Sequence, residues 1–107
     1  MQTTSSNNAR ALAEAGMQAL RSGDAANAKH LFEQIITLGV ADASAFLGLA
    51  YACRYLNDAV ATIKALDAAL SLEPNNLRAM IFKADHLAAA GDERAAVSFY
   101  QIGRAHV

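Results

Sequence analysis

Apolar residues recur along this chain at intervals of three and four positions, the spacing that places them on one face of a helix. One segment shows this spacing in Phe32, Ile35 and Ile36. A later segment shows it in Leu66 and Leu70. β-Branched and aromatic residues never alternate with polar ones over a run, so the pattern lends strands little support. It predicts six helices, over 8–22, 25–38, 42–56, 59–72, 76–90 and 93–101.

The pattern also repeats along the chain at an interval of 34 residues. A shift by this interval aligns large apolar residues with one another, and it aligns small residues four positions later. It also aligns a Gly or Asn that is followed each time by an aspartate. The aligned sets are Leu12, Phe46 and Met80; Gly16, Ala50 and Ala84; Gly23, Asn57 and Gly91; and Asp24, Asp58 and Asp92. Repeats of this length indicate a stack of similar helical units.

Each unit is predicted to form two helices joined by a tight turn. The Gly or Asn ends the first helix because it adopts a left-handed backbone at low cost. The following aspartate caps the second helix, because its carboxylate accepts hydrogen bonds from the free backbone N–H groups there. Small residues are expected to meet where the two helices pack, so that their backbones approach closely. The predicted pairs are Gly16 with Ala28, Ala50 with Thr62, and Ala84 with Ala96.

These features resemble the tetratricopeptide repeat. The period, the contact between small residues, the Gly–Asp turn and the closing run Pro74-Asn75-Asn76 all match that family. The resemblance implies an all-α fold, a right-handed superhelical stack of three helical hairpins (an α-solenoid), with the last hairpin truncated. The three repeats would cover 9–42, 43–76 and 77–101, after a disordered polar N-terminus over 1–8.

Lys83 interrupts the apolar face of the fifth predicted helix. Ala15 and Leu49 occupy the equivalent positions of the earlier repeats. We expect the aliphatic stem of Lys83 to be buried while its ammonium group reaches the surface. The alternative is a salt bridge into a segment further downstream, since a buried ammonium group needs a partner.

The repeat pattern fails over the last residues, 102–107. Gly103, Arg104 and His106 stand where the earlier repeats carry apolar or small residues. The segment is either a degenerate end of the last repeat or a non-native tail that looks like a translated sequencing adapter, and we favour the tail. A shortened last hairpin would expose apolar surface at an open C-terminal end, so a dimer through that end is expected.

Composition and charge narrow the classes of partner. The net charge is −1, from nine Lys or Arg residues and ten Asp or Glu residues spread along the chain. Such a balance offers no basic surface for nucleic acid or for a membrane. The polar N-terminus does not resemble a signal peptide and no apolar run could span a bilayer, so a cytoplasmic location is expected.

Residues that could support catalysis are spread over the sequence. His30, His86 and His106 lie in three different hairpins, and no spacing typical of metal ligands occurs. Cys53 aligns with core positions of the other repeats, so we expect a buried and unreactive thiol. The sequence therefore predicts a chain that is not an enzyme and that binds no metal or cofactor.

The resemblance implies a concave surface lined by the first helix of each hairpin. Aromatic residues and arginines, which dominate binding energy at protein interfaces, are predicted there. The candidate partner-binding residues are Met17, Leu47, Tyr51, Arg54, Tyr55, Arg78, Ile81, Phe82 and Asp85. Aromatic residues at helical spacing also suit a core, and this alternative stays open. The clamp with which one branch of the family holds a C-terminal carboxylate is absent, because only Arg78 is basic at the matching positions.

These predictions favour a scaffold that binds a protein or peptide in the concave groove. The alternative is the N-terminal helical module of a larger enzyme. Residues 80–92 are similar to the repeats that precede bacterial aspartyl/asparaginyl β-hydroxylase-type dioxygenases. That resemblance implies an iron and 2-oxoglutarate site in a later domain, and a downstream domain of the same chain as the partner of the groove.

Overall fold

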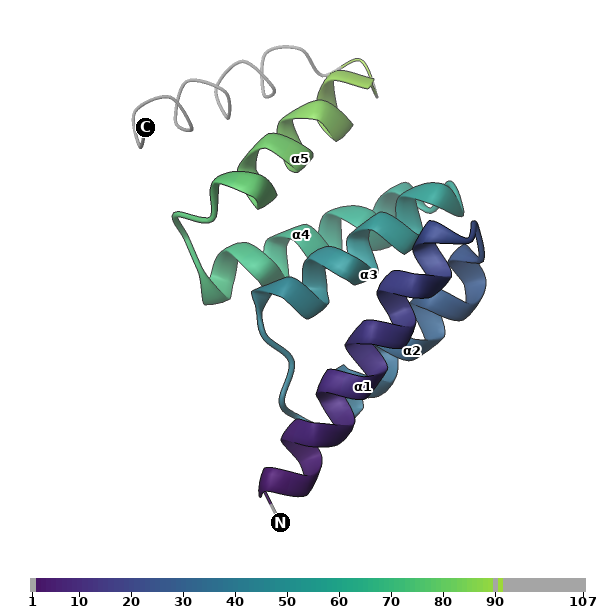
Figure 1. The fold of residues 1–107 in the computed structure, drawn as a ribbon. Helices are drawn as coiled ribbons and strands as arrows, with labels where there is room; N and C mark the ends of the chain where they lie inside the picture. Colours follow the sequence, from purple (N-terminus) through teal and green to yellow (C-terminus); the bar gives the residue numbers. More distant parts are fainter. Residues whose placement is uncertain (1, 90, 92–107) are drawn as a thin grey trace.

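The computed structural model describes residues 2–89 and 91, and in this part of the chain every regular element is a helix. The helices are α1 (Gln2–Arg21), α2 (Ala25–Thr37), α3 (Ala43–Tyr55), α4 (Ala59–Leu72) and α5 (Leu77–Ala89). The pairs α1–α2 and α3–α4 form antiparallel hairpins, and α5 continues the stack beside α4 (Figure 1). The predicted all-α helical solenoid is confirmed.

The first helix differs most from its predicted bounds. Helix α1 begins at Gln2, whereas the sequence placed its start at residue 8 and disorder over 1–8. Extending an existing helix costs far less than nucleating one, so a polar segment with weak helix propensity can continue the helix that follows it. The predicted helix over 93–101 and the tail over 102–107 lie outside the described residues.

Two tight turns join the helices of the complete hairpins, and they follow the predicted chemistry. Gly23 has φ +83° and Asn57 has φ +60°, the left-handed backbone that ends each first helix. Asp24 and Asp58 then cap α2 and α4, and each accepts a hydrogen bond from the backbone N–H three residues later, at 3.2 and 3.0 Å. The Gly/Asn–Asp signal therefore defines both turns.

Small side chains lie where the hairpins pack most tightly. Ala28, Ala50, Thr62 and Ala84 are all 0% exposed, as close approach of the helix backbones requires. Thr62 is the one polar residue of this set, and its hydroxyl donates to the backbone carbonyl of Asp58 at 2.8 Å. The threonine that stands here, at the position of Ala28 in the first repeat, therefore leaves no buried hydroxyl without a partner.

Phe32 of α2 joins the first hairpin to the second. Its side chain is 1% exposed, and the tip of its ring lies against the glycines of two other helices. A Cβ atom on Gly48 of α3 would stand 2.3 Å from Phe32 Cζ, and one on Gly16 of α1 would stand 2.8 Å from it. Both positions therefore need glycine because a larger side chain would overlap the Phe32 ring, and not because of an unusual backbone conformation.

At the junction between the second hairpin and α5, the aromatic ring comes from the following helix, α5, instead of from the second helix of the hairpin. Leu66, the equivalent of Phe32 one repeat later, is 0% exposed on α4. Phe82, the equivalent of Gly48, lies on α5 in the same core cluster as Leu66. The second junction is thus filled by a leucine and a phenylalanine where the first has a phenylalanine and a glycine, and this exchange brings an aromatic ring onto α5.

Lys83 of α5 reaches back to the preceding hairpin. Its Nζ lies 2.6 Å from Oδ1 of Asp67 on α4, and the lysine side chain is 19% exposed. The ammonium group thus reaches the surface, as expected, while most of the stem is covered. Asp67 is a partner that neither interpretation of the sequence named, because the helical pattern of α5 alone does not indicate which residues of α4 face it.

Candidate functional site

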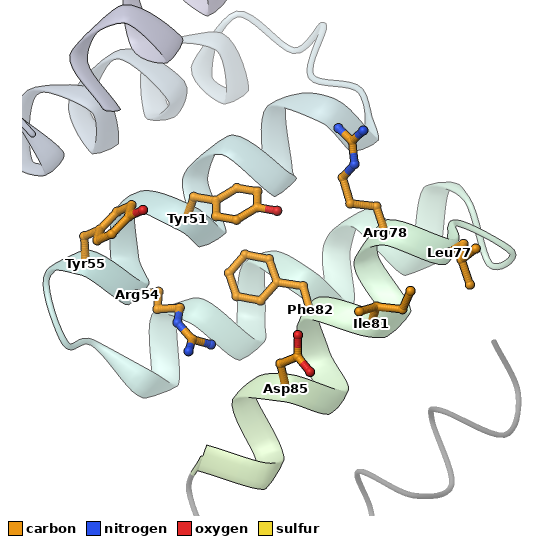
Figure 2. Close-up of a pocket in the computed structure, with 8 residues that line it drawn as sticks. All are labelled: Tyr51, Arg54, Tyr55, Leu77, Arg78, Ile81, Phe82 and Asp85. Carbon is orange, nitrogen blue, oxygen red and sulfur yellow. The ribbon is translucent and has the colours of Figure 1, made fainter. Parts of the chain in front are cut away.

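An open groove lies between α3 and α5. Its volume is about 600 Å³, within the range of ligand sites in proteins. Both helices contribute residues spaced so that they share one helical face (Figure 2). The lining residues are Tyr51, Arg54 and Tyr55 of α3, and Leu77, Arg78, Ile81, Phe82 and Asp85 of α5.

Phe82 forms the floor of the groove. Its side chain is 6% exposed, and its ring centroid lies 4.5 Å from that of Tyr51, with the ring planes tilted by 43°. The guanidinium carbon of Arg54 lies 5.7 Å from the Phe82 centroid, within the range of a cation–π contact. The two contacts hold Tyr51 and Arg54 of α3 against one ring of α5, so they connect the two walls of the groove (Figure 2).

The groove contains more positive than negative side chains. Among the described residues, Arg54 and Arg78 line it together with a single carboxylate, that of Asp85. His86 lies one residue further along α5, where burial lowers its pKa and the positive charge of Arg54 lowers it further. The imidazole is therefore neutral at neutral pH, and the arginines supply the positive charge of this surface.

Seven of the nine predicted partner-binding residues line this groove. Met17 does not, since it lies on α1, outside the α3–α5 groove, where its side chain is 43% exposed. Leu47 does not either, because it is 6% exposed and belongs to the core between α3, α4 and α5. Phe82 is both a core residue and a groove residue, since the same ring packs in the core and forms the groove floor.

Leu77 is a lining residue that the sequence-based prediction missed. It is the first residue of α5 and is 37% exposed. Ile81, which was predicted, lies four residues later on the same face of the helix. That spacing was the signal that could have identified Leu77.

Cys53 stands between the groove residues Tyr51 and Arg54 in the sequence, but its side chain lies in the core. The thiol is 1% exposed, and burial raises its pKa above the ordinary value. Lys29 lowers the pKa by a smaller amount, while Asp58 and Glu33 raise it. A protonated, covered thiol does not act as a nucleophile or metal ligand.

We expect Cys53 to react with a disulfide reagent on the order of 100-fold or more slowly in the native protein than in urea, because reaction requires local opening. Its rate should still be rising with pH where the rate of an ordinary exposed thiol has levelled off, because burial raises the pKa of Cys53. The absorbance change of a chromogenic thiol reagent measures the reaction rate in native buffer, in urea and at each pH. A Cys53→Ser, Ser44→Cys protein carries its thiol at an exposed position of the same helix and should react rapidly. Equal rates for the two native proteins would contradict the burial of Cys53.

Over residues 2–89 and 91, no group of three or more His, Cys, Asp or Glu side chains is arranged to hold a metal ion. In the same part of the chain, no helix is both long and apolar enough to cross a lipid bilayer.

Comparisons with known proteins identify a structural neighbour. No family model matches the chain, and no curated protein matches it in sequence. Among solved structures, PcrH in complex with the chaperone-binding region of PopB superimposes with a TM-score of 0.86, over 94% of this chain and 81% of the other. The chain shares the fold of PcrH. At 22% sequence identity the similarity to PcrH shows the fold alone, and it supports the tetratricopeptide-like helical repeat. It lends no support to the hydroxylase resemblance.

Proposed function

We propose that this chain is a binding scaffold that holds an extended segment of a partner protein in the groove between α3 and α5. The observation that carries the proposal is the lining itself, in which aromatic and aliphatic side chains stand exposed beside two arginines. The fold supports it, because the PcrH structure of the same fold is a complex with the chaperone-binding region of PopB.

The exposure of the lining favours a peptide over a small ligand. Tyr55, Ile81 and Tyr51 are 69%, 42% and 37% exposed, although each carries a large apolar surface. A small ligand would be enclosed by such side chains, whereas here they stand open along two helices (Figure 2). A chain laid over them would bury this surface, and each apolar side chain buried contributes about 1.5–3 kcal/mol before the cost of ordering.

The aromatic residues suit this role because they lose little freedom on binding. Tyr51 is already held against Phe82, so less side-chain entropy is lost when a partner covers it. Tyrosine also contributes both an apolar ring and a hydroxyl that can bond a peptide backbone. The core supports the groove, because Phe82 is anchored among buried residues of α3 and α4.

The test uses random 12-residue peptides displayed on phage and selected against the protein. Ile81→Lys places a charge in the groove and should weaken binding of the enriched peptides by about tenfold or more. Val60→Lys is the matched control, since Val60 is a 70% exposed aliphatic residue on α4 outside the groove. We expect the control to bind as the wild type does. Equal binding by all three proteins would place the site elsewhere and refute the proposal.

The alternative occupants carry less support. No observation on the described residues favours a downstream enzyme domain as the partner, so the groove is assigned to a separate protein. A dimer through the C-terminal end involves residues outside the described part of the chain, and it stays a prediction that sedimentation at several concentrations would test. The cytoplasmic location likewise stays a prediction.

A further inference from the structure

We propose that the peptide held in this groove carries an acidic side chain close to an apolar one, and that Arg54 and Arg78 bind its carboxylate. The inference rests on the proposed function and specifies the chemistry of the partner. It concerns a side-chain carboxylate within a segment, because the matching positions lack the set of residues that would clamp a free C-terminus.

Arg54 is oriented for such a contact before any partner binds. Its guanidinium group lies over the Phe82 ring, with the carbon 5.7 Å from the ring centroid. A guanidinium group in a cation–π contact has several N–H donors, and those that point away from the ring can still bond a carboxylate. A side chain already held in place loses less entropy when it forms these bonds.

Neither groove arginine is neutralised by an ion pair in the described part of the chain. There the single ion pair joins Lys83 to Asp67, and neither of these residues lines the groove. Arg54 and Arg78 are both exposed, and of the described carboxylates only that of Asp85 lines the groove with them. The chain as a whole has a net charge of −1, so this excess of positive charge is a local feature of the groove.

The arrangement also indicates what lies beside the acidic residue. Arg54 and Arg78 extend on opposite sides of Phe82, with Tyr51 next to that ring between them (Figure 2). An extended peptide places alternate side chains about 7 Å apart on the same face. A peptide that seats an apolar side chain against Tyr51 and Ile81 would therefore present a residue two positions away to one of the arginines.

The experiment starts from the peptides enriched in the selection described above, made synthetically with amidated C-termini. Each peptide that contains Asp or Glu is paired with a copy carrying Asn or Gln instead, and affinities are measured by fluorescence anisotropy. We expect the neutral copies to bind the wild-type protein about tenfold more weakly at low salt, because a charge-assisted hydrogen bond is lost. Rising salt should reduce the difference.

The variant Arg54→Gln, Arg78→Gln should bind acidic and neutral copies equally. The variant Arg21→Gln, Lys64→Gln is the control, since it removes the same charge from exposed positions of α1 and α4 outside the groove. It should keep the preference. Circular dichroism of each variant checks that the helices remain folded.

The outcomes separate this inference from the function on which it rests. If acidic and neutral peptides bind the wild type equally while Ile81→Lys still abolishes binding, the acidic preference is refuted and the groove remains the site. If the preference survives in Arg54→Gln, Arg78→Gln, the carboxylate is bound by other residues and the assignment is overturned. If Ile81→Lys has no effect on any peptide, both proposals fail.

Discussion

Replacing Gly48 with alanine is expected to destabilise the protein by about 1–3 kcal/mol, although alanine is the better helix former. In an exposed helix the same exchange would stabilise by about 1 kcal/mol. Here the new Cβ would lie 2.3 Å from Cζ of Phe32, a distance at which atoms overlap. The ring is 1% exposed and its tip also contacts Gly16, so it has little room to move away. Urea denaturation followed by circular dichroism measures the free energy of unfolding.

Two further variants test whether the ring is the cause of this loss. Gly16→Ala should destabilise less, because its Cβ would lie 2.8 Å from the ring rather than 2.3 Å. Adding Phe32→Leu to Gly48→Ala should recover part of the loss, since a shorter side chain makes room for the methyl group. A Gly48→Ala protein as stable as the wild type would show that the ring can move aside, and it would contradict the tight packing of this junction.

Replacing Leu66 with alanine is expected to lower the free energy of unfolding by about 2–5 kcal/mol. Leu66 is 0% exposed and packs in the cluster that joins α3, α4 and α5, so truncation leaves a cavity between three helices. For a chain of 107 residues this is a large part of the total stability. The same denaturation experiment measures the loss.

Leu72→Ala is the matched control for this prediction. Leu72 lies on the same helix, α4, but is 53% exposed, so its truncation should cost no more than about 0.5 kcal/mol. Peptide binding by Leu66→Ala should also weaken, because Phe82 would lose a neighbour that supports the groove floor. Similar stability changes for the two leucines would contradict the assignment of Leu66 to the core.

The local features of the fold were predictable because each depends on residues close together in the sequence. The ends of the first helices follow from Gly23 and Asn57, whose left-handed backbone an ordinary residue adopts less readily. Asp24 and Asp58 signalled the caps. The caps of α3 and α5, Asp42 and Asn76, were not identified, since neither is an aspartate that directly follows a Gly or Asn.

The lining of the candidate site was predictable in part, and Leu47 shows the limit. Leu47 and Ile81 occupy equivalent positions of successive repeats, so the sequence pattern treats them alike. Leu47 is 6% exposed because residues of α5, Ala79 and Phe82, share its core cluster. Ile81 is 42% exposed in the groove. Exposure at a given repeat position therefore depends on which helix packs against it.

The sequence by itself determined the helical period, the repeat and the turns between paired helices, because these depend on backbone preferences and on spacing within one unit. Only the tertiary structure decided that the ring of Phe32 fills the space above Gly48 while the ring of Phe82 lies beside Leu66 and beneath the groove. It also decided that Lys83 pairs with Asp67. Side-chain volumes and charges from different hairpins must fit one another at each junction, and this fit is set by the packing of helices that lie apart in the sequence.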